Sequence, residues 1–168
     1  MNRLSENQYR ELLAQARPLA EDRRGIKVFQ LPDGLMGKIF RRRSFVTSDL
    51  LRPYALRFQR NAEALFLRKI KTVTVEKVFF CPSRKEHLVL YWPVPGRTLR
   101  QVLVEGKGAG DLLNRFSIFL ARLHGKGVLF RSIHFGNIIV SGENRLDFAL
   151  IDIADMTIRG KPLNSKNR

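Results

Sequence analysis

Apolar residues recur every three or four positions in several stretches of the chain, which is the spacing of an amphipathic helix. The pattern predicts four helices, over residues 5–16, 48–70, 98–104 and 111–124. Ser5 is the expected N-cap of the first, because Gln8 three residues later completes a capping box. In the second helix, Ser48 or Asp49 is the expected N-cap. Its expected apolar face consists of Leu50, Tyr54, Phe58, Ala62, Leu65 and Phe66.

Alternating apolar and polar positions, rich in β-branched and aromatic residues, predict strands between these helices. The expected strands cover residues 26–31, 35–40, 72–80, 85–91, 138–141 and 148–153. The sequence Pro32-Asp33-Gly34 joins the first two as a hairpin, because proline presets φ and glycine accepts a positive φ. The prolines of the segment 92–96 suit neither a helix nor a central strand, so we expect a connector there.

The order of these elements indicates an α+β fold built from two small lobes. A sheet-rich half comes first, and a helix-rich half follows the connector. The expected division is an N-terminal lobe over residues 1–92, a hinge over 93–97, a C-terminal lobe over 98–160 and a basic tail over 161–168.

The formal net charge of +16 bears on the partners of the protein. It favours a polyanion, namely nucleic acid, anionic lipid or a phosphorylated glycan, although a purely solubilising role also fits. Cys81 is the single cysteine, which excludes an internal disulfide and fits a reducing compartment. The sequence has no apolar stretch long enough to span a membrane and no apolar secretory signal at its start. We therefore expect a cytoplasmic protein.

The most informative segment lies between residues 123 and 156. It reads LHGKGVLFRSIHFGNIIV and then, after a short interval, LIDIADM. This order of helix end, polar loop and two strands resembles the H-R-D-L-x-x-x-N loop and the later D-F-G element of protein kinases. Asn137 stands five residues after position 132, as that pattern requires. On these residues the chain resembles bacterial sugar and aminoglycoside kinases, and above all the lipopolysaccharide kinase family (Kdo and heptose kinases), which includes proteins labelled toluene tolerance.

The resemblance implies a protein-kinase-like fold that uses ATP and Mg²⁺ as cofactors. It implies that Asn137 and Asp152 give oxygen ligands to Mg²⁺ and that Lys38 holds the α- and β-phosphates. Glu63 is the implied ion-pair partner of Lys38. The implied adenine-binding hinge consists of Tyr91, Trp92 and Val94.

Each of these residues also has an ordinary structural interpretation. An asparagine after a loop is often a turn residue, and an aspartate at the end of a strand is often a helix cap or a turn residue. A lysine in a hairpin and a glutamate on a helix usually face solvent. The order Lys38, Asn137, Asp152, with a proline-rich connector between the first two, favours nucleotide binding over these separate roles.

Position 132 departs from the kinase pattern, because Ser132 stands where an aspartate accepts the proton of the substrate hydroxyl. Arg131 matches the pattern, whereas Phe130 replaces the histidine before it. The loss of an oriented general base costs on the order of 10²–10⁴-fold in rate. His134 is one candidate for the replacement base, and its alternative role is structural. Asp155 is another residue to consider, because it either approaches the metal or the substrate or caps the next segment. The third possibility is that positioning of the reactants and Mg²⁺ carry the reaction without a base.

Two other features depart from the kinase pattern. The first hairpin lacks a preceding G-x-G-x-x-G loop, and Asp22-Arg23-Arg24-Gly25 stands near its place. The sequence also ends at Arg168, soon after Asp152, so we expect a short C-terminal lobe.

These observations leave three functions open. The first is MgATP-dependent phosphorylation of a lipopolysaccharide core sugar, with an acidic glycolipid as substrate and peripheral contact to the inner face of an anionic membrane. The expected surface for that contact consists of Arg41, Arg42, Arg43, Arg57 and Arg60. The second is a pseudokinase scaffold, favoured by Ser132. The third is a basic nucleic-acid-binding module, which is disfavoured because no zinc-finger, RNA-binding or helix-turn-helix pattern is present.

Overall fold

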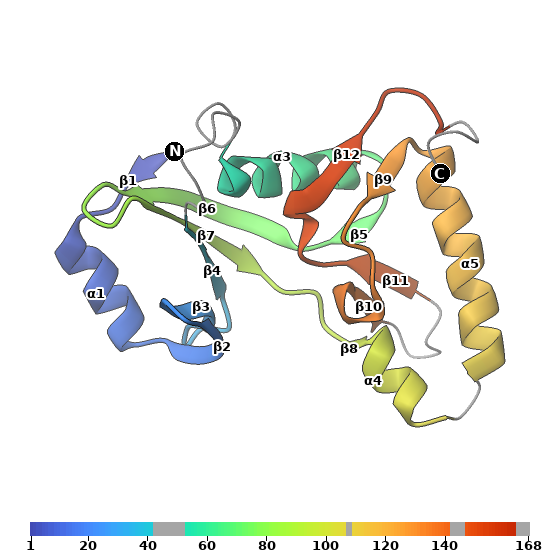
Figure 1. Cartoon of the computed structure of the whole chain (residues 1–168), viewed down its shortest axis with the longest axis horizontal. Coiled ribbons are helices and arrows are strands. Elements are labelled where there is room, and N and C mark those ends of the chain that lie inside the picture. The colour runs from blue at the N-terminus through green and yellow to red at the C-terminus, as the bar shows by residue number, and fades with distance from the viewer. Residues whose placement is uncertain (42–52, 107–108, 142–146, 164–168) are drawn as a thin grey trace. The chain divides into compact units, whose positions relative to one another are not determined.

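The fold is that of a computed structural model, which describes residues 1–41, 53–106, 109–141 and 147–163 (Figure 1). The chain forms two compact units, Met1–Arg60 with Val73–Pro93, and Asn61–Thr72 with Val94–Arg168. The helices are α1 (Glu6–Ala14), α3 (Tyr54–Leu67), α4 (Leu99–Val104) and α5 (Ala109–Gly125), with 3₁₀ turns η1 (Phe135–Asn137) and η2 (Ile153–Asp155). The strands are β1 (Asn2–Arg3), β2 (Arg17–Asp22), β3 (Gly25–Gln30), β4 (Met36–Arg41), β5 (Lys71–Thr72), β6 (Thr74–Cys81), β7 (Glu86–Trp92), β8 (Arg97–Thr98), β9 (Val128–Phe130), β10 (Ile138–Ser141), β11 (Asp147–Leu150) and β12 (Met156–Ile158). The predicted α+β class is confirmed.

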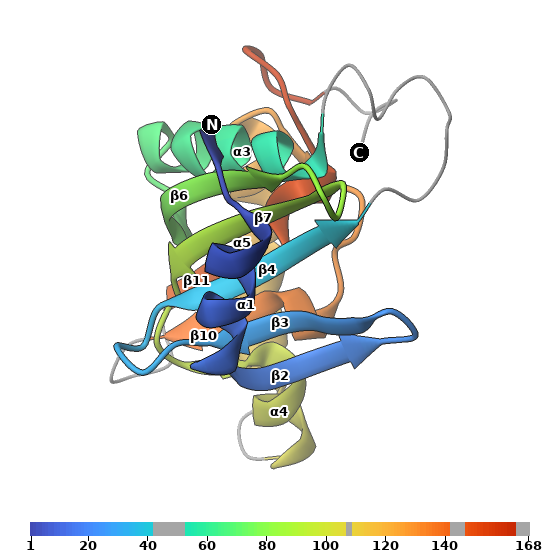
Figure 2. The ribbon, with the colours of Figure 1, turned by 90° about the vertical axis from the view of Figure 1, so that its left-hand side faces the viewer.

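The first unit is built on a six-stranded sheet in the order β1-β6-β7-β4-β3-β2. The neighbouring strands are antiparallel, apart from the parallel pair β1 and β6. Helix α1 lies across one face of this sheet (Figure 2) and closes an apolar core against it. That core consists of Leu4, Tyr9, Phe29, Leu35, Ile39, Cys81, Leu88 and Leu90.

Local sequence signals determine where the elements of this unit begin and turn. Ser5 and Gln8 form the predicted capping box at the start of α1, with each side chain accepting a backbone N–H of the other residue. The predicted Pro-Asp-Gly turn between β3 and β4 is also confirmed. Gly34 has a φ of 90°, and the Asp33 carboxylate accepts a hydrogen bond from the Leu35 amide at 3.0 Å.

Gly37 allows the sheet to pack closely beside Lys38. A Cβ atom at Gly37 would lie 2.1 Å from the ring of Phe29, which is fully buried. A glycine inside a strand commonly marks such a close approach. The Phe29 ring therefore occupies the space that a side chain at position 37 would take.

Arg41 lies at the centre of a polar network rather than on a free basic surface. Its Nε donates to Glu86 Oε1 at 2.8 Å, and its guanidinium also donates to Asp22 Oδ1 at 2.9 Å and to the Ile26 carbonyl at 2.6 Å. The side chain of Arg41 is only 9% exposed. The prediction that Arg41 contacts an anionic membrane is therefore wrong, and Arg42 and Arg43 lie outside the described residues.

The network also fixes the turn between β2 and β3, which stands where the kinase pattern has its glycine-rich loop. The backbone amide of Arg24 donates to Asp22, and this bond, together with the charge of Arg41, lowers the pKa of the Asp22 carboxyl. Strand β2 was not predicted, because its residues are all exposed and Pro18 breaks their pattern. Its presence makes β4 the third strand of an antiparallel run that begins at β2.

The second unit contains a four-stranded sheet in the order β5-β11-β10-β8 and a separate pair, β9 and β12. Helix α5 packs on the larger sheet through aromatic rings, since Phe116 and Phe119 lie 5.6 and 5.3 Å from the ring of Phe148 on β11. Gly96 lies at the end of the connector that leads into this unit and has a φ of 136°. A Cβ atom there would lie 2.4 Å from the Val140 carbonyl oxygen. A residue with a side chain therefore does not fit at this end of the connector.

Helix α3 ends in a Schellman motif with an unusual residue at its left-handed position. The Ile70 amide donates to the Leu65 carbonyl, and the Lys69 amide donates to the Phe66 carbonyl. Glycine is the usual residue at this position, but here Lys69 has a φ of 54°. A left-handed backbone costs a residue with a side chain about 1–2 kcal/mol.

Several sequence predictions need correction. The strand predicted over 148–153 ends at Leu150, because Asp152 has a left-handed backbone and a 3₁₀ turn follows. Phe66 is 79% exposed and does not belong to the apolar face of α3. The predicted caps Ser48 and Asp49 lie outside the described residues.

Two segments differ from the expected lobe boundaries of 1–92 and 98–160. Residues 61–72 group with the second unit, because β5 pairs with β11. Leu163 in the expected basic tail is buried, and its amide donates to the His124 carbonyl at 2.9 Å. Within the described residues, no helix has both the length and the apolar character needed to cross a membrane.

We predict that Tyr9 links the stability of the first unit to alkaline pH. Its hydroxyl donates to Glu86 Oε2 at 2.7 Å, and burial, followed by that carboxylate, raises the pKa of Tyr9. A raised pKa in the folded state gives stability that is complete below the unfolded value of about 10 and is lost as the pH rises above it.

Tyr9→Phe is therefore expected to cost about 1.5 kcal/mol in the free energy of unfolding at pH 7. Above pH 10 the variant is expected to lose less stability than the wild type. Urea unfolding at both pH values measures this difference. Tyr54→Phe is the matched control, because Tyr54 is exposed. Equal alkaline losses in the wild type and Tyr9→Phe would contradict the prediction.

Candidate functional site

Lys38 is a buried lysine in the interior of the first sheet. It lies on β4 opposite Val28 and Val89 and is only 7% exposed. Its Nζ lies 5.5 Å from the centre of the Phe40 ring and 5.9 Å from that of Phe58 on α3. Lysines are rarely this buried, and a cation next to two ring faces gains electrostatic stabilisation. The alternative of a solvated lysine in a hairpin is therefore wrong.

The hinge residues lie where the first unit ends. Tyr91 is buried on β7, with its ring 5.4 Å from that of Phe58, whereas Trp92 is 43% exposed. Val94 belongs to the second unit. Adenine binding at these three residues stays a prediction.

Asn137 is the buried polar residue of the loop that resembles a kinase catalytic loop. Its Nδ2 donates to the Ser132 carbonyl at 2.9 Å, and its amide donates to the His134 carbonyl at 2.8 Å. Its own carbonyl accepts from the Ile151 amide at 3.0 Å. Its Oδ1 accepts no hydrogen bond within the described part of the chain. The side chain thus holds the loop through its amide nitrogen.

Asp152 lies two residues after the end of β11, next to Ile151, whose amide donates to the Asn137 carbonyl. Its backbone is left-handed, with φ 55° and ψ 45°, a conformation that is rare outside glycine and asparagine and is concentrated at functional sites. Its carboxylate is exposed and makes no capping hydrogen bond to η2, so the helix-cap alternative is wrong. Asn61 on α3 holds the next residue by donating to the Ile153 carbonyl at 2.7 Å.

The short ladder of β9 and β12 brings Ser132 to a carboxylate. Met156 pairs with Phe130, and the Arg131 amide donates to the Asp155 carbonyl at 3.3 Å. Beside this ladder, Ser132 Oγ donates to Asp155 Oδ2 at 3.0 Å. A carboxylate therefore lies within hydrogen-bond distance of position 132, where the kinase pattern has an aspartate.

Neither β9 nor β12 was predicted, and the missed signal was weak. Each strand has three residues, and their partners are 26 positions apart in the register that pairs Phe130 with Met156. The only local indication was the apolar run Val128-Leu129-Phe130, which is too short to distinguish a strand from a loop.

His134 has a structural role in the same loop. Its Nδ1 accepts a hydrogen bond from the Gly136 amide at 3.1 Å and so caps η1. It would have to give up that bond in order to accept a proton at Nδ1. Arg131 is exposed beside the loop. Roles for these two residues in catalysis stay predictions.

Glu63 is exposed on α3. It lies two residues after Asn61 and is therefore roughly 160° from it around the helix. The side of α3 that reaches the Ile153 carbonyl is thus not the side that carries Glu63. An ion pair between Glu63 and Lys38 stays a prediction.

The oxygen donors of the second unit fit a Mg²⁺ ion that also binds phosphate. Mg²⁺ is usually held by one or two carboxylates together with substrate phosphates and water. Asn137 Oδ1 and the Asp152 carboxylate are donors of this kind, and the hydrogen bond from Ile151 to Asn137 brings their backbones together. The described residues contain no group of three or more His, Cys, Asp or Glu that could hold a metal by themselves.

Comparison with known proteins gives a distant similarity in fold. No protein-family model matches the sequence, and no curated protein matches it significantly. The structure is similar to the kinase PK-1 of Cydia pomonella granulovirus, with 14% sequence identity and a TM-score of 0.49. The match covers 95% of this chain, which spans 58% of that kinase. This similarity concerns the arrangement of helices and strands and gives no information on substrate or activity.

The hydrogen bond between Ser132 and Asp155 predicts the effect of restoring the kinase aspartate. Ser132→Asp would place two carboxylates within about 3 Å, so one of them would have a raised pKa and the pair would repel at neutral pH. We expect a loss of about 1–3 kcal/mol in the free energy of unfolding at pH 7 and little loss at pH 4, where the pair shares a proton.

Chemical unfolding of Ser132→Asp at the two pH values measures this effect. The double variant Ser132→Asp with Asp155→Asn is the matched control, because it exchanges donor and acceptor and should recover the stability at pH 7. A single variant as stable as the double variant at pH 7 would contradict this account.

Proposed function

We propose that the chain is a MgATP-dependent phosphotransferase that phosphorylates a sugar hydroxyl of an acidic glycolipid, the inner core of lipopolysaccharide. The fold and the residue types support phosphoryl transfer. The choice of a lipopolysaccharide acceptor depends on the resemblance of residues 123–156 to that family of sugar kinases.

The arrangement around Asn137 carries the proposal. A side chain that only ended a turn would use its oxygen within the loop. Asn137 instead uses Nδ2 to fix the Ser132 carbonyl and leaves Oδ1 without a described donor. Asp152, the nearest expected carboxylate ligand, has a left-handed backbone and no capping role. Together the two residues supply the oxygen set that a phosphate-bound Mg²⁺ requires.

MgATP, when bound, supplies the transferable γ-phosphoryl group and a metal ion that neutralises its charge. Asn137 Oδ1 and the Asp152 carboxylate would hold the metal. The Lys38 ammonium group holds the α- and β-phosphates, and its burial strengthens that attraction by excluding water. The backbone of Tyr91 and its neighbours takes the adenine edge.

Asp155 takes the role of the missing base. Its carboxylate, positioned by Ser132 Oγ at 3.0 Å, accepts the proton of the acceptor hydroxyl as the sugar oxygen forms its bond to the γ-phosphorus. The bond between that phosphorus and the bridging oxygen breaks, and ADP leaves with the electron pair. Ser132 is a positioning residue in this scheme. The loose transition state of phosphoryl transfer places a modest demand on such a base.

The positive charge of the chain suits an acidic acceptor and an anionic membrane surface. Arg57 and Arg60 on α3 are the described members of the expected surface. Arg60 is exposed, and the guanidinium of Arg57 lies 4.7 Å from the centre of the Tyr54 ring. We propose that they contact phosphate groups of the glycolipid or of the lipid layer.

The absence of a carboxylate at position 132 favours a second candidate, a pseudokinase scaffold. In that case Asp155 serves only to hold the loop through Ser132 and the Arg131 amide. The scaffold would have no turnover and would bind nucleotide weakly or not at all.

Calorimetric titration with MgATP tests the proposed nucleotide site. We expect the wild type to bind, and we expect Lys38→Ala and Asp152→Ala each to weaken binding at least about tenfold, the equivalent of about 1.4 kcal/mol. Lys27→Ala is the matched control, because Lys27 is exposed on the neighbouring strand β3. Absence of binding by the wild type would exclude the ATP-dependent mechanism.

Phosphate transfer to core oligosaccharide then tests the proposed base. Asp155→Asn is expected to lower the rate about 10²–10⁴-fold while the affinity for MgATP is unchanged. The double variant Ser132→Asp with Asp155→Asn should recover activity, because a carboxylate returns to the kinase position. No transfer by a wild type that binds MgATP would favour the scaffold.

A further inference from the structure

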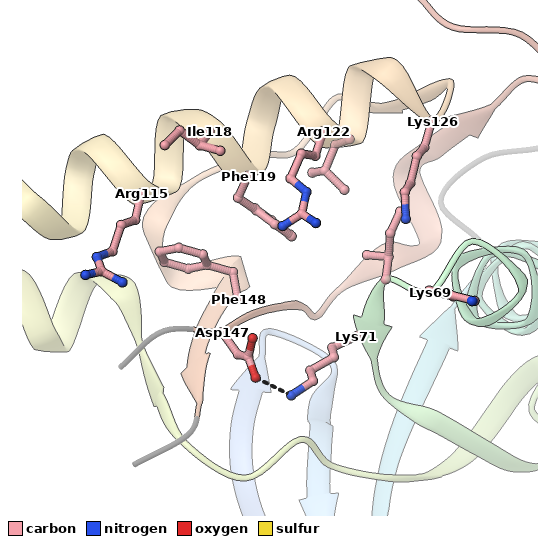
Figure 3. Close-up of a pocket in the computed structure, with 11 residues that line it drawn as sticks. Lys69, Lys71, Arg115, Ile118, Phe119, Arg122, Lys126, Asp147 and Phe148 are labelled. Carbon is pink, nitrogen blue, oxygen red and sulfur yellow. Dashed lines mark hydrogen bonds and ion pairs between the residues drawn. The ribbon is translucent and has the colours of Figure 1, made fainter. Parts of the chain in front are cut away.

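The second unit contains a basic pocket that the proposed phosphoryl transfer does not use. It lies between α5, β11 and the segment 69–71 and has a volume of about 370 Å³ (Figure 3). Its cationic side chains are those of Lys69, Lys71, Arg115, Arg122 and Lys126, and Asp147 is its one acidic residue. All of its lining residues belong to the second unit. We refer to it as the basic pocket.

Three of the five cations are already engaged by the protein. Lys71 pairs with Asp147 at 2.5 Å, Arg115 pairs with Asp111 at 2.7 Å, and Lys126 donates to the Arg68 carbonyl. The side chains of Lys69 and Arg122 have no hydrogen bond or ion pair with any residue in the described ranges. Among the described residues, therefore, these two cations have no counter-charge.

The concentration of positive charge in the basic pocket lowers the stability of the protein. Arg122 lies in the last turn of α5, and Lys126 follows directly after the end of this helix, so two like charges lie close together along the chain. Lys69 has the left-handed backbone at which glycine would be more stable. A strained backbone at a residue that lines a pocket indicates a function for that position. These two observations come from different elements of the fold.

The walls of the basic pocket also offer an apolar surface. Phe119 and Phe148 lie side by side at a ring distance of 5.3 Å, and Ile118 is 55% exposed beside them. Pockets of a few hundred cubic ångströms with apolar walls and a few charged groups suit small molecules. The combination fits a ligand with an anionic group and a ring or apolar portion.

We propose that the basic pocket binds the phosphate group of a small phosphorylated ligand. Lys69 and Arg122 supply the charge-assisted hydrogen bonds, and Phe119 contacts the remainder of the ligand. The planar guanidinium group of an arginine can bind two phosphate oxygens at once, and the ammonium group of a lysine binds them as a point charge. A phosphate group can therefore be held by two cations from different elements of the fold. A phosphorylated soluble metabolite and a phosphomonoester lipid headgroup share this chemistry.

The basic pocket is separate from the residues proposed to hold MgATP. Asp147, at its edge, and Asp152 lie at opposite ends of the segment that contains β11, about 16 Å apart if that segment is fully extended. The inference therefore does not rest on the proposed function, and the two can fail independently.

Calorimetric titration with inorganic pyrophosphate in EDTA, and flotation with phosphatidylcholine vesicles that contain phosphatidic acid, test the inference. We expect the wild type to bind at least one of these probes. The double variant Lys69→Gly with Arg122→Gln is expected to weaken that binding at least about tenfold. Lys69→Gly alone should keep or raise the melting temperature, because glycine suits the left-handed position, so a loss of binding would not reflect unfolding.

The matched control is Arg17→Gln with Lys77→Gln, which removes the same charge from exposed positions of the first unit. The control should bind within about twofold of the wild type. Pyrophosphate binding would identify a soluble ligand, and binding to vesicles alone would identify a lipid headgroup. The proposal is overturned if neither probe binds, if the pocket variant binds like the wild type, or if the control loses as much affinity as the pocket variant.

Discussion

The hydrogen bonds of Asn137 determine the geometry of the second unit. One buried residue joins the loop before it, through the Ser132 and His134 carbonyls, to the segment after β11, through the Ile151 amide. A buried amide whose partners were lost would leave several polar groups unsatisfied, which is costly. The position of Asp152 therefore depends on the main-chain carbonyl of Asn137, whereas the Asn137 side chain holds the loop at Ser132.

Ser132 and Asp155 form one hydrogen-bonded pair beside the β9–β12 ladder. Ser132 is the donor of this bond, and the Asp155 carboxylate is the acceptor. A serine at position 132 donates a hydrogen bond to the neighbouring carboxylate, whereas an aspartate at the same position would be repelled by it. For this reason position 132 cannot be interpreted without position 155.

Strong local signals made much of the fold predictable. The Ser5 capping box, the Pro-Asp-Gly turn and the apolar periodicity of α5 each act within a few residues, so the sequence carries them directly. The missed features depend on distant partners. The exposed edge strand β2 has no apolar alternation, and β9 pairs with β12 across the intervening strands β10 and β11. Lys38 was identified by its order along the chain, whereas its burial and the engagement of Arg41 by Glu86 required the sheet.

Cys81 gives the protein a natural reporter of its own breathing motions. The thiol is 1% exposed within the core beneath α1, and it is the one cysteine in the sequence. A thiol reagent reaches it only when that core opens, so the modification rate measures local opening of the first unit. The second unit has no thiol and contributes nothing to that signal. The opening of the first unit can thus be followed without introducing a cysteine into the protein, whatever the rate at which the second unit unfolds.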